Sequence, residues 1–247
     1  MELSVLGSSS RGNCYILQDS DEALIIEAGV AISNILEAVS YKVDKVVGCI
    51  VSHEHKDHSK SVEKLQSYGV KCYMSKGTSE GVKYSTYPEI VENGKQFSIG
   101  SFSILPFDTH HDSNEPLGYL ISHKSFGTLL FAIDTCYLPY TFADLSNIMI
   151  ECNYSEDILD RNVKEGVVHP IVRKHIAKSH MSLQTCKEAL QANDLTKVDK
   201  VILLHLSKDN GDAERFKTEV AQAVGKDVLI AEKGMKVIIG NTPFDYE

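Results

Sequence analysis

The chain has 247 residues, of which 43% are hydrophobic and 24% charged, as is ordinary for a globular protein with a sizeable core. Its formal net charge of −9 argues against a surface that coats nucleic acid, and it favours small anionic substrates or short strand ends. The N-terminus does not resemble a signal peptide and no run of about 18 apolar residues occurs, so we expect a cytoplasmic protein that does not enter a membrane.

The N-terminal segments predict strands and turns. A strand at residues 3–6 leads into a Gly/Ser-rich turn at residues 7–13, which could cradle a phosphate with its backbone amides or could be a plain tight turn. Residues 14–17 and 23–26 then predict a hairpin, and the apolar spacing of residues 32–39 predicts a helix.

The stretch at residues 52–58 places three imidazoles and two carboxylates directly after the apolar run at 46–51, which reads as a buried strand. His53 and His55 would project to one side, while the following turn would bring Asp57 and His58 toward a second position. This spacing favours two adjacent metals that share one loop over a solvated loop that is histidine-rich by chance. A helix from Ser59 to Tyr68, a strand near 71–75 and a short helix after Thr78 continue an α/β pattern.

The middle of the chain predicts antiparallel strands at residues 96–99, 101–105, 118–121 and 128–132. Two more candidate ligands follow strands in this part. His110 and His111 are adjacent, so only one of them can face a metal in an extended chain. Asp134 follows an apolar strand, where a carboxylate is hard to explain by packing, and we favour a metal ligand over a helix N-cap.

The C-terminal part predicts strands at 148–151, 201–204, 228–230 and 237–239 and helices at 153–163, 183–192 and 212–224, the second capped by Ser182. His205 ends its strand as Asp134 does, which favours a metal ligand. The segment from Arg161 to His180 is basic, and it could be a phosphate-binding arm or a solvated helix face. Nothing resembles a linker, so we expect a single domain over residues 1–247.

Taken together, these motifs resemble the metallo-β-lactamase-fold hydrolase superfamily, an α/β class with an αββα sandwich and two metals at one sheet edge. Within it, residues 4–8 with Gly12 and Asn13, and the segments at 111–116, 133–135, 179–182 and 204–207, look like the WalJ-type exonucleases. The chain is also similar to the phage anti-Pycsar phosphodiesterases, which destroy cyclic mononucleotide signals. The resemblance implies that one metal is held by His53, His55 and His111 and the second by Asp57, His58 and His205, with Asp134 as the bridge.

Two residues depart from the family pattern. Glu27 stands where many relatives have aspartate, and its longer arm would alter the support of the metal loop. Cys136, where glycine is common, could be a soft ligand, but a packed thiol is favoured. The other cysteines form no C-x-x-C pair, which argues against a disulfide framework. The chain has no room for a β-CASP insertion, so processing of long RNA is less attractive.

The resemblance implies two divalent metal ions, zinc in the first place and manganese as the alternative, and hydrolysis of a phosphodiester bond by a metal-bound hydroxide. Asp57 would hold or deprotonate the water, and His180 would contact the phosphate or protonate the leaving oxygen unless it is purely structural. We expect cyclic mononucleotides as substrates, as in phage evasion of cyclic-nucleotide immune signalling, and possible homodimers. The alternatives are a 5′–3′ DNA or RNA exonuclease and a metal-binding module without catalysis.

Overall fold

The computed structural model describes residues 1–82 and 87–240, and in this part of the chain the strands form two seven-stranded sheets. The first sheet has the order β14-β1-β2-β3-β4-β5-β6. Its strands are β1 (Glu2–Gly7), β2 (Cys14–Gln18), β3 (Ala23–Ile26), β4 (Val46–Ile50), β5 (Cys72–Met74), β6 (Glu89–Ile90) and β14 (Lys236–Ile238). The predicted hairpin is confirmed, because β2 and β3 pair antiparallel.

The second sheet has the order β13-β12-β11-β10-β9-β8-β7. Its strands are β7 (Phe97–Ile99), β8 (Phe102–Asp108), β9 (Leu117–His123), β10 (Gly127–Ala132), β11 (Leu145–Glu151), β12 (Lys200–Leu204) and β13 (Asp227–Ile230). The four strands from β7 to β10 pair antiparallel, as the sequence predicts, and β10 to β13 pair parallel.

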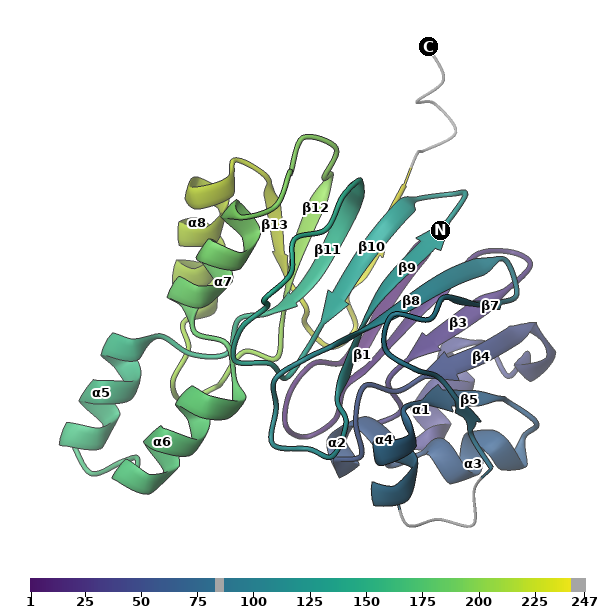
Figure 1. Ribbon diagram of the computed structural model, residues 1–247, viewed down its shortest axis with the longest axis horizontal. Helices are drawn as coiled ribbons and strands as arrows, with labels where there is room; N and C mark the ends of the chain where they lie inside the picture. The colour runs from purple at the N-terminus through teal and green to yellow at the C-terminus, as the bar shows by residue number, and fades with distance from the viewer. Residues whose placement is uncertain (83–86, 241–247) are drawn as a thin grey trace.

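Helices cover the outer face of each sheet, so the predicted αββα sandwich is confirmed (Figure 1). The helical segments are α1 (Ile32–Ala38), η1 (Val43–Lys45), α2 (Lys56–Ser59), α3 (Val62–Ser67), α4 (Lys76–Gly81), α5 (Glu156–Lys164), α6 (Pro170–Ser179), α7 (Leu183–Gln191) and α8 (Ala213–Val224). Helices α1 and α3 pack on the first sheet and α7 and α8 on the second. The α5–α6 pair projects from the sandwich.

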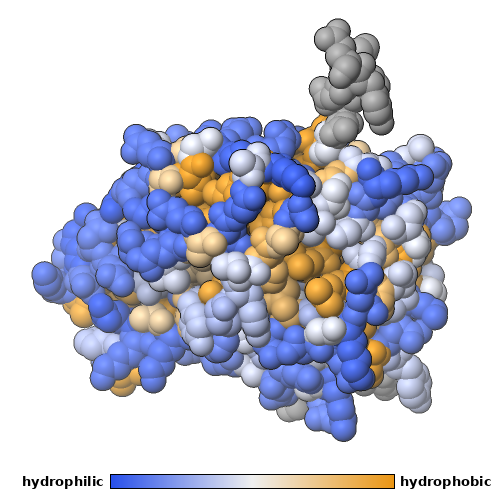
Figure 2. All heavy atoms as spheres, turned by 45° about the horizontal axis from the view of Figure 1, so that its top comes forward, coloured by the Kyte–Doolittle hydropathy of each residue, from blue (hydrophilic) through white to orange (hydrophobic). Residues whose placement is uncertain are grey.

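The largest hydrophobic core lies between the two sheets. Buried aromatic side chains from both sheets meet there, with Tyr15 and Phe131 in edge-to-face contact at 5.7 Å between ring centroids. Figure 2 shows that, on the face it presents, hydrophilic residues surround a central area of apolar ones. Because the core takes residues from both sheets, we propose that the chain folds as one domain. None of the described helices is long and apolar enough to cross a membrane.

The sequence prediction was wrong about the helix after the metal loop. In place of a helix from Ser59 to Tyr68, the structure has two short helices, α2 and α3. Ser59 ends α2, and its hydroxyl donates to the carbonyls of Glu54 and His55 rather than capping a helix. The next helix, α4, begins before Thr78, because Ser75 is its N-cap and accepts from the Thr78 amide. The helix expected at 153–163 begins at Glu156.

Candidate metal centre

The candidate ligands follow strands that end at the same edge of the sandwich. The loop at residues 52–55 follows β4, Asp134 follows β10, and His205 follows β12. Parallel strands place their carboxyl ends together, so the fold gathers side chains that are far apart in sequence. Asp134 and His205 have left-handed backbones, with φ of 45° and 54°. This conformation is uncommon for residues other than glycine and is typical of functional sites.

Three imidazoles form the first group, the three-histidine cluster of His53, His55 and His111. Nε2 of His53 lies 3.0 Å from Nδ1 of His55, and Nε2 of His111 lies 3.3 Å from the same atom. Oδ2 of Asp134 is 3.7 Å from Nε2 of both His53 and His111. The three nitrogens therefore converge on one point beside a carboxylate.

The second group is the carboxylate cluster of Asp57, His58, Asp134 and His205. Nε2 of His58 lies 3.1 Å from Oδ2 of Asp134 and 3.4 Å from Oδ2 of Asp57. Nδ1 of His205 lies 2.7 Å from Oδ1 of Asp134. Asp134 thus contacts both clusters, while Asp57, with 22% of its side chain exposed, lies at the rim.

The two clusters hold their protons differently. Burial lowers the pKa of His53 far below its ordinary value and also lowers that of His111. Burial would lower the pKa of His205 too, but Asp134 and then Glu151 outweigh it and raise the pKa to about 10. Burial would also lower the pKa of His58, but Asp134 and then Glu27 outweigh burial and raise this pKa well above its ordinary value. The three-histidine cluster favours neutral imidazoles, and the carboxylate cluster attracts positive charge.

Glu151 is a site residue that the sequence reasoning missed. It ends β11 and is fully buried, with Oε1 2.7 Å from Nδ1 of His180 and 3.2 Å from Nδ1 of His205. Its other oxygen accepts from the amides of Thr135 and Met181. A carboxylate at the end of an apolar strand is the same pattern that indicated Asp134, so this pattern also indicates Glu151 as a candidate site residue.

His180 lies beside both clusters, with its ring centroid 5.5 Å from that of His111 and 5.3 Å from that of His205. Burial would lower its pKa, but Glu151 outweighs burial and raises it. Elsewhere in the basic segment, Nε2 of His175 lies 3.6 Å from Oδ2 of Asp112. Arg173 pairs with Asp160 at 2.6 Å, and α6 has exposed Lys174 and Lys178.

Glu27 and Asn13 support the metal loop from the first sheet. Oε1 of the buried Glu27 accepts from the Ser52 amide at 3.0 Å, and Oε2 lies 3.1 Å from Nδ1 of His58. The side chain of Glu27 therefore reaches the metal loop. Its backbone is left-handed, with φ of 65°. Asn13 lies 3.0 Å from Nε2 of His58 through its Nδ2 atom.

His110 and Cys136, which the sequence left as alternative ligands, do not join the donor clusters. The structure brings His111 to the cluster rather than His110, whose Nε2 is 2.9 Å from the Tyr137 hydroxyl. Cys136 is half-buried, burial raises the pKa of its thiol, and it belongs to none of the described groups that could hold a metal. All six cysteines are free.

The donor atoms fit divalent cations. Three groups have ligand atoms within 4.8 Å of one another: His53, His55 and His111; His53, His58 and Asp134; and Asp134, Glu151, His180 and His205. Nε2 of His205 is buried and has no hydrogen-bond partner among the described residues. Imidazole and carboxylate donors suit zinc, manganese and iron.

Comparisons with known proteins identify the family and the fold of the chain. A family model described as a beta-lactamase superfamily domain matches residues 30–206. Exodeoxyribonuclease WalJ of Streptococcus pneumoniae strain D39 is 28% identical over 231 residues, which cover 85% of this chain and 83% of the relative. Exodeoxyribonuclease YycJ of Bacillus anthracis is 23% identical over 257 residues, which cover 96% and 92%. The metallo-beta-lactamase fold protein YhfI from Bacillus subtilis superposes with a TM-score of 0.73 at 18% identity, covering 96% of this chain and 98% of that one.

Proposed function

The chain belongs to the beta-lactamase superfamily as a metal-dependent hydrolase of the metallo-β-lactamase fold, and we propose that it hydrolyses phosphodiester bonds at the ends of nucleic-acid strands. The observation that carries the chemistry is the contact of Asp134 with two donor clusters at one strand edge. The strand end as substrate is supported by relatives named exodeoxyribonucleases, which align with most of the chain.

In this proposal His53, His55 and His111 hold one cation, and Asp57, His58 and His205 hold the second, with Asp134 between them. A bound pair of divalent cations supplies a water of lowered pKa and stabilises negative charge on the phosphoryl oxygens. Burial keeps the pKa of His53 low, so the chain presents a neutral donor there at pH 7.

Asp57 and His180 are the proposed catalytic side chains. Asp57 lies at the rim, where its carboxylate can accept a proton from the attacking water, and Asn13 Nδ2 donates to its Oδ2 at 3.4 Å. Glu151 fixes Nδ1 of His180 at 2.7 Å and raises the pKa of the ring. His180 also lines a cavity of about 430 Å³ together with His205. It is therefore placed to protonate the leaving oxygen.

A substrate panel tests this function. The metal-loaded protein is incubated with 5′-phosphorylated single-stranded DNA, duplex DNA, RNA and cyclic mononucleotides, and the products are separated by chromatography. We expect mononucleotides released from strand ends. Consumption of cyclic mononucleotides alone would show a phosphodiesterase with a different substrate, and no hydrolysis of any diester would refute the proposal.

Cyclic mononucleotides are the second candidate substrate, favoured by the net charge of −9 and by the short chain of 247 residues. Zinc is the proposed metal and manganese the alternative, which elemental analysis of the purified protein distinguishes. A homodimer and a cytoplasmic location also remain proposals. Sedimentation and cell fractionation test them.

A further inference from the structure

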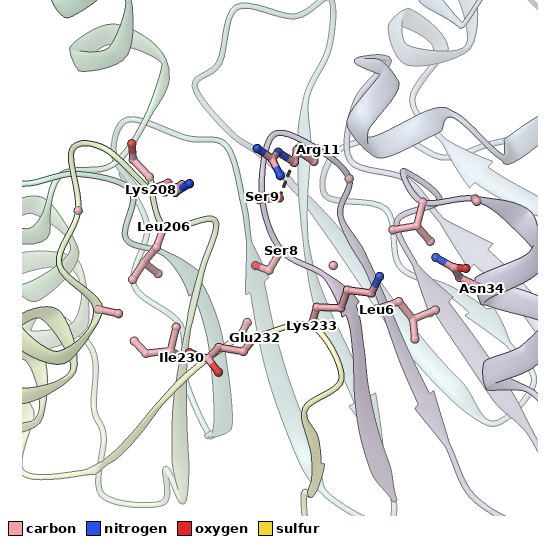
Figure 3. Close-up of a pocket in the computed structure, with 18 of the residues that line it drawn as sticks. Leu6, Ser8, Ser9, Arg11, Asn34, Leu206, Lys208, Ile230, Glu232 and Lys233 are labelled. Atoms are coloured by element: carbon pink, nitrogen blue, oxygen red, sulfur yellow. Dashed lines mark hydrogen bonds between the residues drawn. The ribbon is translucent and has the colours of Figure 1, made fainter. Parts of the chain in front are cut away.

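A basic cavity of about 730 Å³ opens beside the candidate metal centre, within the size range of ligand pockets. It lies between the β1–β2 turn, the start of α1, the loop after β12 and the turn after β13 (Figure 3). Its wall therefore comes from both halves of the sandwich. Figure 3 shows Lys208 at the left and Arg11 at the top centre, with Glu232 and Lys233 below them.

Positive charge is concentrated in this cavity although the chain is acidic. Arg11, Lys60, Lys208 and Lys233 line it, and Glu232 is the carboxylate among the lining residues. All four cations are exposed, and none is paired with a carboxylate in the part of the chain that the structure describes. Four unpaired cations around one hollow in a chain of net charge −9 favour an anionic ligand.

The basic cavity adjoins a smaller cavity at the metal centre and shares lining residues with it. The 430 Å³ cavity that His180 and His205 line is also lined by Arg11 and Lys208. Lys60 and Lys233 line only the larger cavity, so positive charge extends outward from the centre. Ser8 joins the two regions, because its hydroxyl accepts from the His205 amide at 2.9 Å.

The turn that carries Arg11 has a fixed shape. Gly12 donates its amide to the Ser9 carbonyl at 2.8 Å and has φ of +149°. A Cβ atom at Gly12 would lie 2.6 Å from the Gly29 carbonyl oxygen, so the backbone passes too close for a side chain. The turn is therefore a tight one, and it holds Arg11 at the rim between the two cavities.

We propose that the basic cavity binds the phosphodiester backbone of the nucleic-acid strand beyond the bond that is cleaved. Phosphates recur along a strand, so Arg11 and Lys208 would meet the nearer one and Lys60 and Lys233 the next. A cyclic mononucleotide has a single phosphate, which the metal centre would occupy, and it would leave these four cations unused. The inference rests on the proposed function, and it selects strands over cyclic mononucleotides.

The salt dependence of binding tests this proposal. The probe is a fluorescein-labelled single-stranded 12-mer with phosphorothioate linkages, and its anisotropy is measured with the metal-loaded protein from low to high NaCl. Each phosphate contact contributes about 0.7 to the slope of log Kd against log salt. Because Lys60 and Lys233 meet one phosphate in this proposal, the double variant Lys60→Gln/Lys233→Gln should flatten the slope by about 0.7. Arg11→Gln/Lys208→Gln should flatten it by a similar amount.

The matched control is Lys124→Gln/Lys217→Gln, which makes the same change in net charge at two exposed lysines outside the cavity. We expect the wild-type slope from this control. Equal slopes for control and cavity variants overturn the cavity as the strand site, even if the wild type digests DNA ends. A flattened slope in the cavity variants alone supports the site, even if the substrate panel shows no hydrolysis of strands.

Discussion

The three-histidine cluster and the carboxylate cluster differ in the partners that hold their imidazoles. Nδ1 of His53 lies 2.9 Å from the Ser52 hydroxyl, and Nδ1 of His111 lies 2.8 Å from the Ser179 carbonyl. In the carboxylate cluster the corresponding partners are anions. Glu27 contacts His58, and Glu151 contacts His205.

This difference explains the opposite pKa directions. Neutral partners cannot offset burial, so His53 and His111 have lowered pKa values. Asp134 in the first place, then Glu27 beside His58 and Glu151 beside His205, outweigh burial and raise the pKa of His58 and His205. The three-histidine cluster therefore presents neutral imidazoles to a cation at pH 7. The histidines of the carboxylate cluster must first release protons.

Asp134→Ala should have the largest effect, because it removes a carboxylate that contacts both clusters. We expect activity to fall by at least about 10²-fold, since even residues that only support ligands cost 10- to 100-fold. Metal content per chain, measured by mass spectrometry, should fall with it. Asp21→Ala, in the exposed β2–β3 turn, is the control and should behave as wild type. Full activity with unchanged metal content would rule out the bridging role.

His180→Gln should separate catalysis from metal binding. Loss of a general acid costs typically 10²- to 10⁴-fold in kcat, while the metal content should stay unchanged. Because the pKa of His180 is raised, its acid form persists to higher pH, and the wild-type rate should fall as that form is lost. The variant should lack this fall in its pH profile. His175→Gln, exposed on α6, the helix that ends just before His180, is the control. A loss of less than twofold would make His180 structural.

The sequence predicts an α/β protein with candidate ligands at its strand ends because apolar runs are followed by polar residues, while the αββα sandwich and the full ligand set are what the resemblance to the superfamily implies. His53, Asp134 and His205 each follow an apolar run, and polar groups of this kind are rarely buried without a partner. Glu151 ends an equally apolar run, so the same sequence pattern indicates it as a candidate.

Other features of the site depend on tertiary structure. The neutral partners of the three-histidine cluster are a common hydroxyl and a backbone carbonyl, which have no sequence signature. The left-handed backbones of Asp134 and His205 have none either, because packing imposes them. The basic cavity joins Arg11, Lys60, Lys208 and Lys233 from distant segments, so the sequence pointed instead to the segment from Arg161 to His180.

Glu151→Gln and Glu27→Gln should weaken the carboxylate cluster selectively. Removing an anionic support should cost about 10- to 100-fold in metal affinity there, with little change at the three-histidine cluster. Competition with a coloured chelator resolves the two affinities. Ser52→Ala, which removes a neutral partner, should have a smaller effect. If it weakens binding as much as Glu151→Gln, the distinction between anionic and neutral partners is wrong.

The smallest effect concerns proton release on metal binding. With its pKa at about 10, His205 carries a proton at pH 8, and the pKa of His58 is also raised. Metal binding at pH 8 should therefore release at least about one proton from the carboxylate cluster, that of His205, and few from the three-histidine cluster. Affinity at the carboxylate cluster should rise with pH through neutrality and level off near the pKa of His205.

Calorimetry in two buffers of different ionisation enthalpy measures the protons released. His205→Ala should release about one proton fewer than the wild type, because it removes a group that is protonated before the metal binds. His111→Ala is the matched variant and should release as many as the wild type, since burial lowers the pKa of His111 and leaves it neutral at pH 8. Equal losses in both variants would mean that the two clusters do not differ in how they hold protons.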